Sequence, residues 1–357
     1  MDLNQLLAPP GHGVFTVHAA KERKDKLDHF IYGRHDPKES WLKSLRKIPS
    51  SKILLFGIPS DNGGGIHRGA NWGPLVAREC LLKESTQTFL DLGDIRVIPH
   101  YLSDSLLSKK AIESSRFALY GNKKSKLPVS PLDMSEALMK KVRALNPSAK
   151  VMMIGGDHSV SFPVIKEWLE SRRKKKIKTA VIHFDAHTDL LESRLGVDVC
   201  FGTWTYHLLP FLESPQHLIQ MGIRSSGKPK SFWEKKYGIH QWWAADLKKW
   251  GINKTIERLK KILTSLKAEE IYITFDFDAL DERFAATTGT PEPHGLEPHE
   301  AVLLINAIGD FKPVTGVDLV EFAPFIQFKA GLEKVSYDSI GILARTLLNQ
   351  LHKHEKD

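Results

Sequence analysis

The chain has 357 residues, of which 41% are hydrophobic and 26% are charged. This composition is typical of a globular protein with a large core and excludes a disordered or fibrous chain. No apolar run approaches the roughly 20 residues needed to cross a bilayer, and no signal-peptide pattern opens the chain, so we expect no membrane partner. Two cysteines, Cys80 and Cys200, are too few for a disulfide framework and predict a cytoplasmic protein.

The formal net charge of +9 raises the question of nucleic-acid binding. The densest basic run, residues 172–178, follows a stretch at 161–170 that has a helical pattern. Cations at a helix C-terminus are stabilised by the helix dipole, so a solvated helix end explains the run. No RNA-binding aromatic signature or zinc-finger spacing accompanies it, and we expect no nucleic-acid partner.

Residues 1–50 are polar, with two short amphipathic pieces, and we interpret them as an N-terminal extension that packs on a main domain at 51–357. Strands are expected at 53–58, 151–154, 180–184, 217–223, 271–275 and 314–319. Helices are expected at 134–145, 161–170, 254–266, 298–308 and 337–352. The alternation predicts an α/β fold with a parallel sheet and helices on both faces. Residues 103–131 show the weakest pattern, and we expect a surface excursion there.

Residues 181–189 begin as a buried strand and switch within a few positions to Asp185, His187 and Asp189. Alternate side chains at a strand end can point the same way. Two carboxylates and an imidazole in such proximity repel one another unless a cation lies between them. Aspartates at a strand end also make helix caps and turns, so this stretch alone leaves both readings open.

Further metal-ligand types follow other predicted strands: His158 comes after 151–154, and Asp276 and Asp278 come after 271–275. Ligands bind at the carboxyl ends of parallel strands, where all these groups fall. Two divalent cations would balance the four carboxylates, whose burial without partners would cost several kcal/mol each. Oxygen and nitrogen ligands without thiolate suit Mn²⁺, and less well Ni²⁺, Co²⁺ or Zn²⁺. We therefore predict a binuclear site that activates water for hydrolysis.

The strand-end motifs resemble those of the ureohydrolases, which include arginase, agmatinase and formimidoylglutamase, over roughly residues 51–350. The stretches that carry the resemblance are 155–159 (Gly-Gly-Asp-His-Ser), 185–189 (Asp-Ala-His-Thr-Asp), 274–278 (Thr-Phe-Asp-Phe-Asp), 222–224, 288–296 and 318–324, with Pro59, Asp61, 68–70 and 73–74 in a first loop. The resemblance implies a three-layer, arginase-like α/β fold with two Mn²⁺ per subunit. It assigns the ligands as His158 and Asp189 to the first metal, His187 and Asp278 to the second, and Asp185 and Asp276 to both.

The resemblance also implies the remaining roles. Glu321 would hold the substrate's cationic guanidinium or amidine by a charge-assisted pairing, and Asp278 would orient the attacking hydroxide or pass on its proton. Thr290 is expected to contact the substrate from the 288–296 loop. Relatives of this kind form homo-oligomers, so a trimer or hexamer is expected.

One position departs from the family. Phe201 stands where relatives carry a histidine that shuttles a proton or contacts substrate, and phenylalanine cannot carry a proton. His207, His240 and His294 are substitutes to consider, although a structural role explains each more simply. With Phe201, Trp204 is expected to contact the substrate in a pocket that is more apolar or aromatic than that of arginase.

These features predict a hydrolase that acts on a C–N bond of a linear amidine, with a small guanidino or formimino compound as substrate and without arginine specificity. A catalytically impaired relative that acts by binding or regulation is the first alternative. An amide deacetylase and a two-metal phosphoesterase are the others. The deacetylase would be expected to bind one zinc, and the phosphoesterase would need basic side chains near the metals, for which Arg224 is the obvious candidate.

Overall fold

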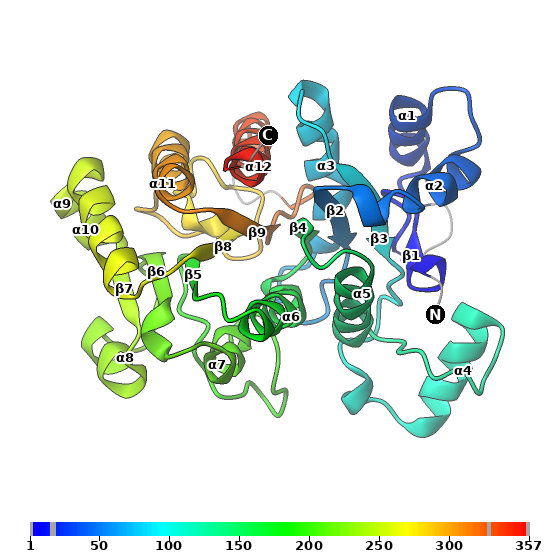
Figure 1. Cartoon of the computed structure of the whole chain (residues 1–357), viewed down its shortest axis with the longest axis horizontal. Coiled ribbons are helices and arrows are strands. Elements are labelled where there is room, and N and C mark those ends of the chain that lie inside the picture. The colour runs from blue at the N-terminus through cyan, green and yellow to red at the C-terminus, as the bar shows by residue number, and fades with distance from the viewer. Residues whose placement is uncertain (1–2, 15–18, 327–329, 355–357) are drawn as a thin grey trace.

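The computed structural model describes residues 3–14, 19–326 and 330–354, and its strands form a nine-stranded sheet between two layers of helices (Figure 1). The strands are β1 (Leu7–Ala8), β2 (Ile53–Ile58), β3 (Leu90–Ile95), β4 (Lys150–Gly155), β5 (Thr179–Phe184), β6 (Leu218–Ile223), β7 (His240–Trp243), β8 (Glu270–Asp276) and β9 (Val314–Val320). Across the sheet their order is β1-β3-β2-β4-β9-β8-β5-β6-β7. All neighbouring pairs are parallel except β1 and β3, which pair antiparallel.

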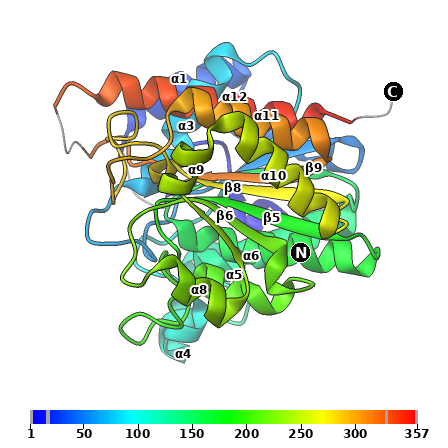
Figure 2. The same ribbon diagram turned by 90° about the vertical axis from the view of Figure 1, so that its left-hand side faces the viewer.

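Helices cover both faces of the sheet, as the alternating sequence pattern predicts. They are α1 (Lys21–Tyr32), α2 (Pro37–Leu45), α3 (Gly73–Glu84), α4 (Lys109–Tyr120), α5 (Pro131–Leu145), α6 (Ser161–Lys174), α7 (Trp204–Leu208), α8 (Lys230–Tyr237), α9 (Ala244–Trp250), α10 (Ile252–Ser265), α11 (Pro298–Phe311) and α12 (Glu333–His352). In the two views, α3, α11 and α12 lie above the sheet and α5 and α6 lie below it (Figures 1 and 2). Among the described residues, no helix is both long and apolar enough to cross a membrane.

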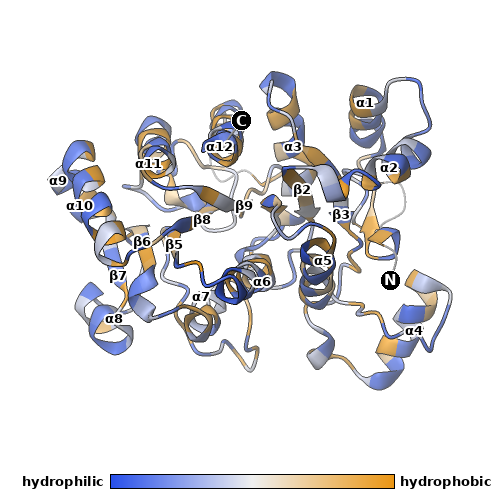
Figure 3. Cartoon of the chain, viewed as in Figure 1, coloured by the Kyte–Doolittle hydropathy of each residue, from blue (hydrophilic) through white to orange (hydrophobic). Residues whose placement is uncertain are grey.

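The sheet separates two apolar cores because successive side chains of a strand point to opposite faces. Within β2, Leu55 belongs to the apolar cluster that contains residues of α3, α11 and α12, whereas Leu54 and Phe56 belong to the cluster that contains residues of α5 and α6. All six residues of β2 are buried, which explains its continuous apolar run. Hydrophilic residues cover the outward faces of helices such as α10 (Figure 3). The predicted three-layer α/β fold is therefore confirmed.

Several elements were missed by the prediction, among them α4 and β7. Residues 103–131 contain the helix α4, which begins after Ser108, whose Oγ accepts from Ala111 N at 3.2 Å, and ends at Gly121 with φ +69°. Ser115 and Leu119 are its buried residues, so it has almost no apolar stripe to reveal it. The strand β7 has only four residues, which is too few for a periodic pattern.

The N-terminal residues are part of the sheet edge. β1 pairs with β3, and Gly11 N donates to Asp94 Oδ2 at 2.7 Å. Trp41 of α2 is buried and its Nε1 donates to the carbonyl of Leu92 in β3 at 2.9 Å. The described part of residues 1–50 thus packs on the main domain and also extends its sheet by one strand.

The loops after β2 and β4 cross at Gly156, close to the carboxyl ends of the strands where the predicted metal ligands lie. Gly156 N donates to the carbonyl of Ile58 at 2.9 Å, and Asp157 N donates to the carbonyl of Ser60 at 2.9 Å. A Cβ at position 156 would lie 1.7 Å from the Ser60 carbonyl oxygen. Only glycine allows the two backbones to approach this closely, and this approach sets the direction in which the chain leaves β4.

We expect Gly156→Ala to destabilise the protein by about 1–3 kcal/mol or more, because the new methyl group displaces a backbone that cannot yield as a side chain would. Urea denaturation followed by circular dichroism would measure the change. Gly227→Ala is the matched control, since its Cβ would have no heavy atom within 4 Å. A loss for Gly156→Ala no larger than that of the control would contradict the account.

Candidate metal centre

The carboxyl ends of four neighbouring strands bring the predicted ligands together. His158 lies in a short 3-10 turn after β4, and Asp185 follows β5 directly. Asp276 is the last residue of β8, and Glu321 follows β9. Because β4, β9, β8 and β5 are adjacent and parallel, these ends meet at one edge of the sheet.

A first group of side chains surrounds the His158 ring. Its Nδ1 lies 3.0 Å from Asp276 Oδ2, 3.3 Å from Asp185 Oδ2 and 3.6 Å from Asp189 Oδ2. All four side chains are buried. Three carboxylate oxygens around one imidazole nitrogen is the donor arrangement of a small divalent cation.

A second group surrounds the His187 ring. Its Nδ1 lies 3.2 Å from Asp278 Oδ2 and 3.4 Å from Asp185 Oδ1. Asp185 therefore faces His158 with one carboxylate oxygen and His187 with the other. The structure thus brings all six sequence-predicted ligands together, in two subsites that share Asp185.

The electrostatics of the cluster demand extra positive charge. Burial first, and then the Asp185 carboxylate, raises the pKa of Asp189 well above its ordinary value. Burial and the Asp278 carboxylate do the same to the pKa of Asp276. Burial opposes charge on His158, but hydrogen bonds with the surrounding aspartates outweigh it and raise its pKa well above 6.5. Without metal the cluster must hold protons, and divalent cations fit this donor set in their place.

Hydrogen bonds fix which nitrogen of each ligand histidine faces the cluster. Thr274 Oγ1 donates its one proton to Asp318 Oδ1 at 2.7 Å, so it accepts from His158 Nε2 at 3.0 Å. His158 Nδ1 is thereby the ring nitrogen that faces the aspartates, where it holds a proton in the absence of metal and can bind a metal in place of that proton. His187 Nε2 lies 3.7 Å from Glu292 Oε1, an arrangement that leaves its Nδ1 for the cluster in the same way.

A third histidine, His183, lies within the first group, where its ligand atom and those of His158, Asp185 and Asp189 all lie within 4.8 Å of one another. Its Nε2 is 2.7 Å from Asp185 Oδ2, and its Nδ1 is 3.0 Å from Gln220 Nε2. Both ring nitrogens are therefore occupied by protein groups. We conclude that His183 positions Asp185 and is not itself a metal ligand.

The contact between Gln220 and His183 is part of a chain of hydrogen bonds that begins at Trp243, and Trp243 determines which group donates at each step. Trp243 Nε1 can only donate, so Gln241 presents Oε1 to it at 3.1 Å and presents Nε2 to Gln220 Oε1 at 2.7 Å. Gln220 must then present Nε2 to His183 Nδ1, which accepts. His183 therefore carries its proton on Nε2 and donates it to Asp185.

The same residues form one row across the sheet. Asp318, Thr274, His183, Gln220 and Gln241 are successive cross-strand partners on β9, β8, β5, β6 and β7. The sequence prediction missed this row, although polar residues inside buried strands were a visible signal. The row lies one layer beneath the ligands and supports them from the sheet.

Two of the site residues have unusual backbones. Asp189 has φ +52° and Glu321 has φ +61°, a left-handed backbone conformation that residues other than glycine rarely adopt. Glu321 Oε1 accepts from His158 N at 2.7 Å. Burial first, and then Asp276, raises the Glu321 pKa well above its ordinary value. Such strain at a buried carboxylate is typical of functional sites.

The structure places the other predicted residues as follows. Trp204 is fully buried, its Nε1 donates to Asp189 Oδ2 at 2.8 Å, and its ring centroid lies 4.5 Å from that of His158. It therefore packs against two predicted ligands and, contrary to the prediction, does not face the cavity. Thr290 Oγ1 donates to Asp278 Oδ2 at 2.9 Å. His207, His240 and His294, the substitutes considered for the absent histidine, do not line the cavity beside the cluster.

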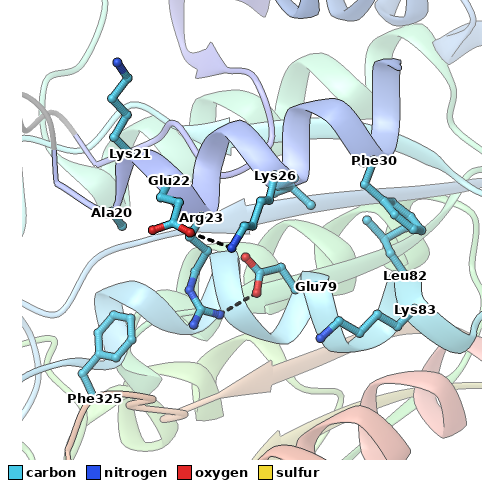
Figure 4. Close-up of a pocket in the computed structure, with 11 residues that line it drawn as sticks. Ala20, Lys21, Glu22, Arg23, Lys26, Phe30, Glu79, Leu82, Lys83 and Phe325 are labelled. Carbon is cyan, nitrogen blue, oxygen red and sulfur yellow. Dashed lines mark hydrogen bonds and ion pairs between the residues drawn. The ribbon is translucent and has the colours of Figure 1, made fainter. Parts of the chain in front are cut away.

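That cavity has a volume of about 510 Å³ and opens from His187 and Asp189 past Phe201 to the surface. A larger hollow of about 650 Å³ lies between α1 and α3 (Figure 4). None of the six predicted ligands lines the larger hollow, and four of its charged side chains are paired with one another, Arg23 with Glu79 at 2.5 Å and Lys26 with Glu22 at 2.7 Å. The smaller cavity is therefore where a substrate would meet the cluster.

We expect Gln220→Leu to weaken binding of a divalent metal by about tenfold or more, because His183 loses the partner that fixes its tautomer and Asp185 loses its orientation. Isothermal titration of the metal-free protein with MnCl₂ would measure the affinity. Gln350→Leu removes another buried amide, which bonds to Asn306 Oδ1 at 2.9 Å between α11 and α12. An equal loss of affinity in both variants would contradict a role for the row.

The pKa shifts also predict how pH affects the metal-free protein. The raised pKa values of His158 and His187 mean that the folded protein holds protons that the unfolded chain releases near 6.5. Their contribution to stability is complete below pH 6.5 and is lost as pH rises above it. Asp185, with its pKa lowered well below 3.8, is ionised in both states throughout this window.

We therefore expect the melting temperature of EDTA-treated protein to fall from pH 6.5 toward about 9. Metal-loaded protein should lose much less over the same interval, because cations then replace the protons. Differential scanning calorimetry of both forms would measure this, and parallel slopes would refute the account.

Comparisons with known proteins agree with the geometry. A family model described as the arginase family matches residues 51–337. An agmatinase of Bacillus cereus is 31% identical over 286 residues, which cover 80% of this chain and 88% of that protein. A proclavaminate amidinohydrolase of Streptomyces clavuligerus is 27% identical over 304 residues, which cover 81% and 85%. The structure of formimidoylglutamase from Bacillus subtilis shares the fold, with a TM-score of 0.66 at 23% identity over 85% of this chain and 88% of that one. This chain belongs to the arginase family.

Proposed function

We propose that the protein is a binuclear manganese hydrolase that cleaves a C–N bond of a guanidino or formimino compound. One observation carries the proposal. Asp185 lies between the His158 and His187 rings, 3.3 Å and 3.4 Å from their Nδ1 atoms, with one oxygen toward each. A shared carboxylate between two imidazole-containing groups is the arrangement that holds two metals close together.

The residues assigned to the metals are the six of the cluster. His158 and Asp189 would hold the first Mn²⁺, His187 and Asp278 the second, and Asp185 and Asp276 both. The chemistry that two such cations supply when bound is Lewis acidity, which lowers the pKa of water toward neutrality. Asp276 Oδ2 lies 3.0 Å from His158 Nδ1, and the charges of Asp278 and Asp185 add to burial in raising its pKa, so Asp276 would be the second shared ligand.

Glu321 is the residue that would bind the substrate's cation. It is buried, and Asp276, Asp157 and Asp61 add negative charge around it and raise its pKa. A planar guanidinium or amidinium would relieve this repulsion and could form paired hydrogen bonds with the carboxylate. The hydrogen bond from His158 N to Oε1 holds Glu321 beside the candidate metal ligands. The central carbon of a guanidinium or amidinium bound to Glu321 would therefore face the cluster.

Asp278 would orient the attacking water and receive its proton. Thr290 Oγ1 donates to Asp278 Oδ2 at 2.9 Å, and Ala186 N donates to Asp278 Oδ1 at 3.1 Å, so both oxygens are fixed in direction. A carboxylate held in this way can accept a proton at Oδ2 without swinging out of the site. Thr290 then acts on the reaction through Asp278.

The phosphoesterase alternative needs a free cation beside the metals, and Arg224 does not supply one. Its guanidinium donates to the backbone carbonyls of Asp278 at 2.7 Å, Pro293 at 2.8 Å and Leu280 at 2.9 Å. Arg224 thus holds the loops around the site together. A guanidino or formimino substrate remains the better match, and the free thiols Cys80 and Cys200 are consistent with the proposed cytoplasmic location.

A hydrolysis screen on manganese-loaded protein would test the proposal. Arginine, agmatine, 4-guanidinobutyrate, guanidine and formiminoglutamate would be assayed for urea, formamide and ammonia. We expect turnover of at least one compound other than arginine, and a loss of about 10³-fold or more in kcat for Asp276→Ala, because a ligand of both metals is gone.

Glu321→Gln is the matched second variant. It should keep the metals, counted by atomic emission spectrometry, while kcat/KM falls, because the amide has no charge to pair with the substrate's cation. No turnover of any compound by protein that binds two metals would contradict the proposal and favour a binding role. Turnover that survives in Asp276→Ala would contradict the assignment of the site.

A further inference from the structure

The cavity beside the cluster changes charge along its length. Its inner end is lined by His187 and Asp189 of the cluster. Its outer end is lined by three cations and one carboxylate, namely Arg194, Lys228, Lys236 and Glu192. Lys236 Nζ pairs with Glu192 Oε1 at 2.9 Å, so these two charges offset each other. Among the described residues, no carboxylate lies within 4.0 Å of the charged nitrogens of Arg194 or Lys228.

Arg194 is held over the cavity by the residue that replaces the family histidine. Its guanidinium carbon lies 4.7 Å from the centroid of the Phe201 ring, a cation–π contact. Its backbone closes a turn with Val197, with N···O distances of 2.9 Å and 3.0 Å. Phe201 N in turn donates to the carbonyl of Gly63 at 2.9 Å, and this bond connects the Phe201 backbone to the loop after β2.

A further carboxylate, Glu292, contacts His187 at the inner end. Glu292 Oε1 lies 3.7 Å from His187 Nε2, and the hydrogen bond with His187 lowers the Glu292 pKa. It therefore supports a metal ligand and does not neutralise Arg194. The cavity is negative where a guanidinium would enter the cluster and positive at its opening.

We propose that Arg194 and Lys228 form a subsite for a carboxylate at the far end of the substrate, which makes the substrate a guanidino or formimino acid. This inference rests on the proposed hydrolysis. Arg194 would donate paired hydrogen bonds to the carboxylate from the edge of its guanidinium while one face stays on the Phe201 ring, and Lys228 would add a second positive charge. A substrate with a terminal ammonium would meet two cations without counter-ions and be repelled.

Two compounds separate the cases because both carry a guanidinium on a short alkyl chain. 4-Guanidinobutyrate ends in a carboxylate and agmatine ends in an ammonium. With manganese-loaded protein we expect kcat/KM to favour the acid by about tenfold or more, since each outer cation attracts one compound and repels the other. Agmatine turned over better than the acid would overturn the subsite while leaving the proposed hydrolysis standing.

The variant Arg194→Glu tests the residue. We expect the ratio of kcat/KM for acid over agmatine to fall by about tenfold or more, chiefly through KM, with a gain for agmatine that misfolding cannot produce. Lys110→Glu, an exposed charge reversal on α4, is the matched control and should leave the ratio unchanged. An unchanged ratio in Arg194→Glu would overturn the proposal.

If neither compound is hydrolysed, binding still decides the subsite, and the proposed function is judged separately on the full panel of five compounds. Calorimetric titration of the metal-loaded protein with the same two compounds would then measure their dissociation constants. Binding of 4-guanidinobutyrate that is tighter than that of agmatine, and weakened in Arg194→Glu, supports the carboxylate subsite. Equal binding of both, or binding of neither, overturns it.

Discussion

Repulsion among buried carboxylates is the constraint on which this structure depends. Asp185, Asp189, Asp276 and Asp278 are buried at adjoining strand ends, where each unpaired charge would cost several kcal/mol. The sheet can bring them together only because cations, or protons in their absence, share the space. The crossing at Gly156, the turn at His158 and the left-handed backbones of the site all serve this convergence. Much of the loop geometry around the sheet edge follows from the need to hold like charges in fixed positions.

The convergence of the candidate ligands could be predicted because these residues lie next to strong local signals. Asp185 comes directly after a strand of apolar residues, and Asp276 ends another, so the pattern fixed both their place in the chain and the edge of the sheet on which they meet. Parallel topology then placed these strand ends side by side without knowledge of the strand order. The fold was predictable for the same reason, since buried parallel strands are long apolar runs between amphipathic helices.

The supporting residues could not be predicted from local pattern because their roles depend on register. Gln220 and Gln241 are polar residues in buried strands, but only the pairing of β5, β6 and β7 shows that they form one chain with His183. Trp204 lies fifteen residues beyond Asp189 and looks like a pocket residue until its Nε1 is seen on that carboxylate. The sequence contains these residues plainly, yet their contacts exist only in three dimensions.

The two ends of the cavity are built on different parts of the fold, and this has a consequence for specificity. The residues assigned to the metals lie at or just beyond the ends of buried strands, and the row beneath them lies within those strands, where each change disturbs several hydrogen bonds. Arg194 belongs to an exposed turn whose next residue, Leu195, is 99% exposed, and it touches the site through the Phe201 ring. Substitutions in the turn can therefore change the charge offered to the far end of a substrate without moving a metal ligand. If Arg194 binds the far end of the substrate as proposed, Phe201 contributes to selectivity at the opening of the cavity, because an aromatic ring that cannot carry a proton can still hold a guanidinium in place.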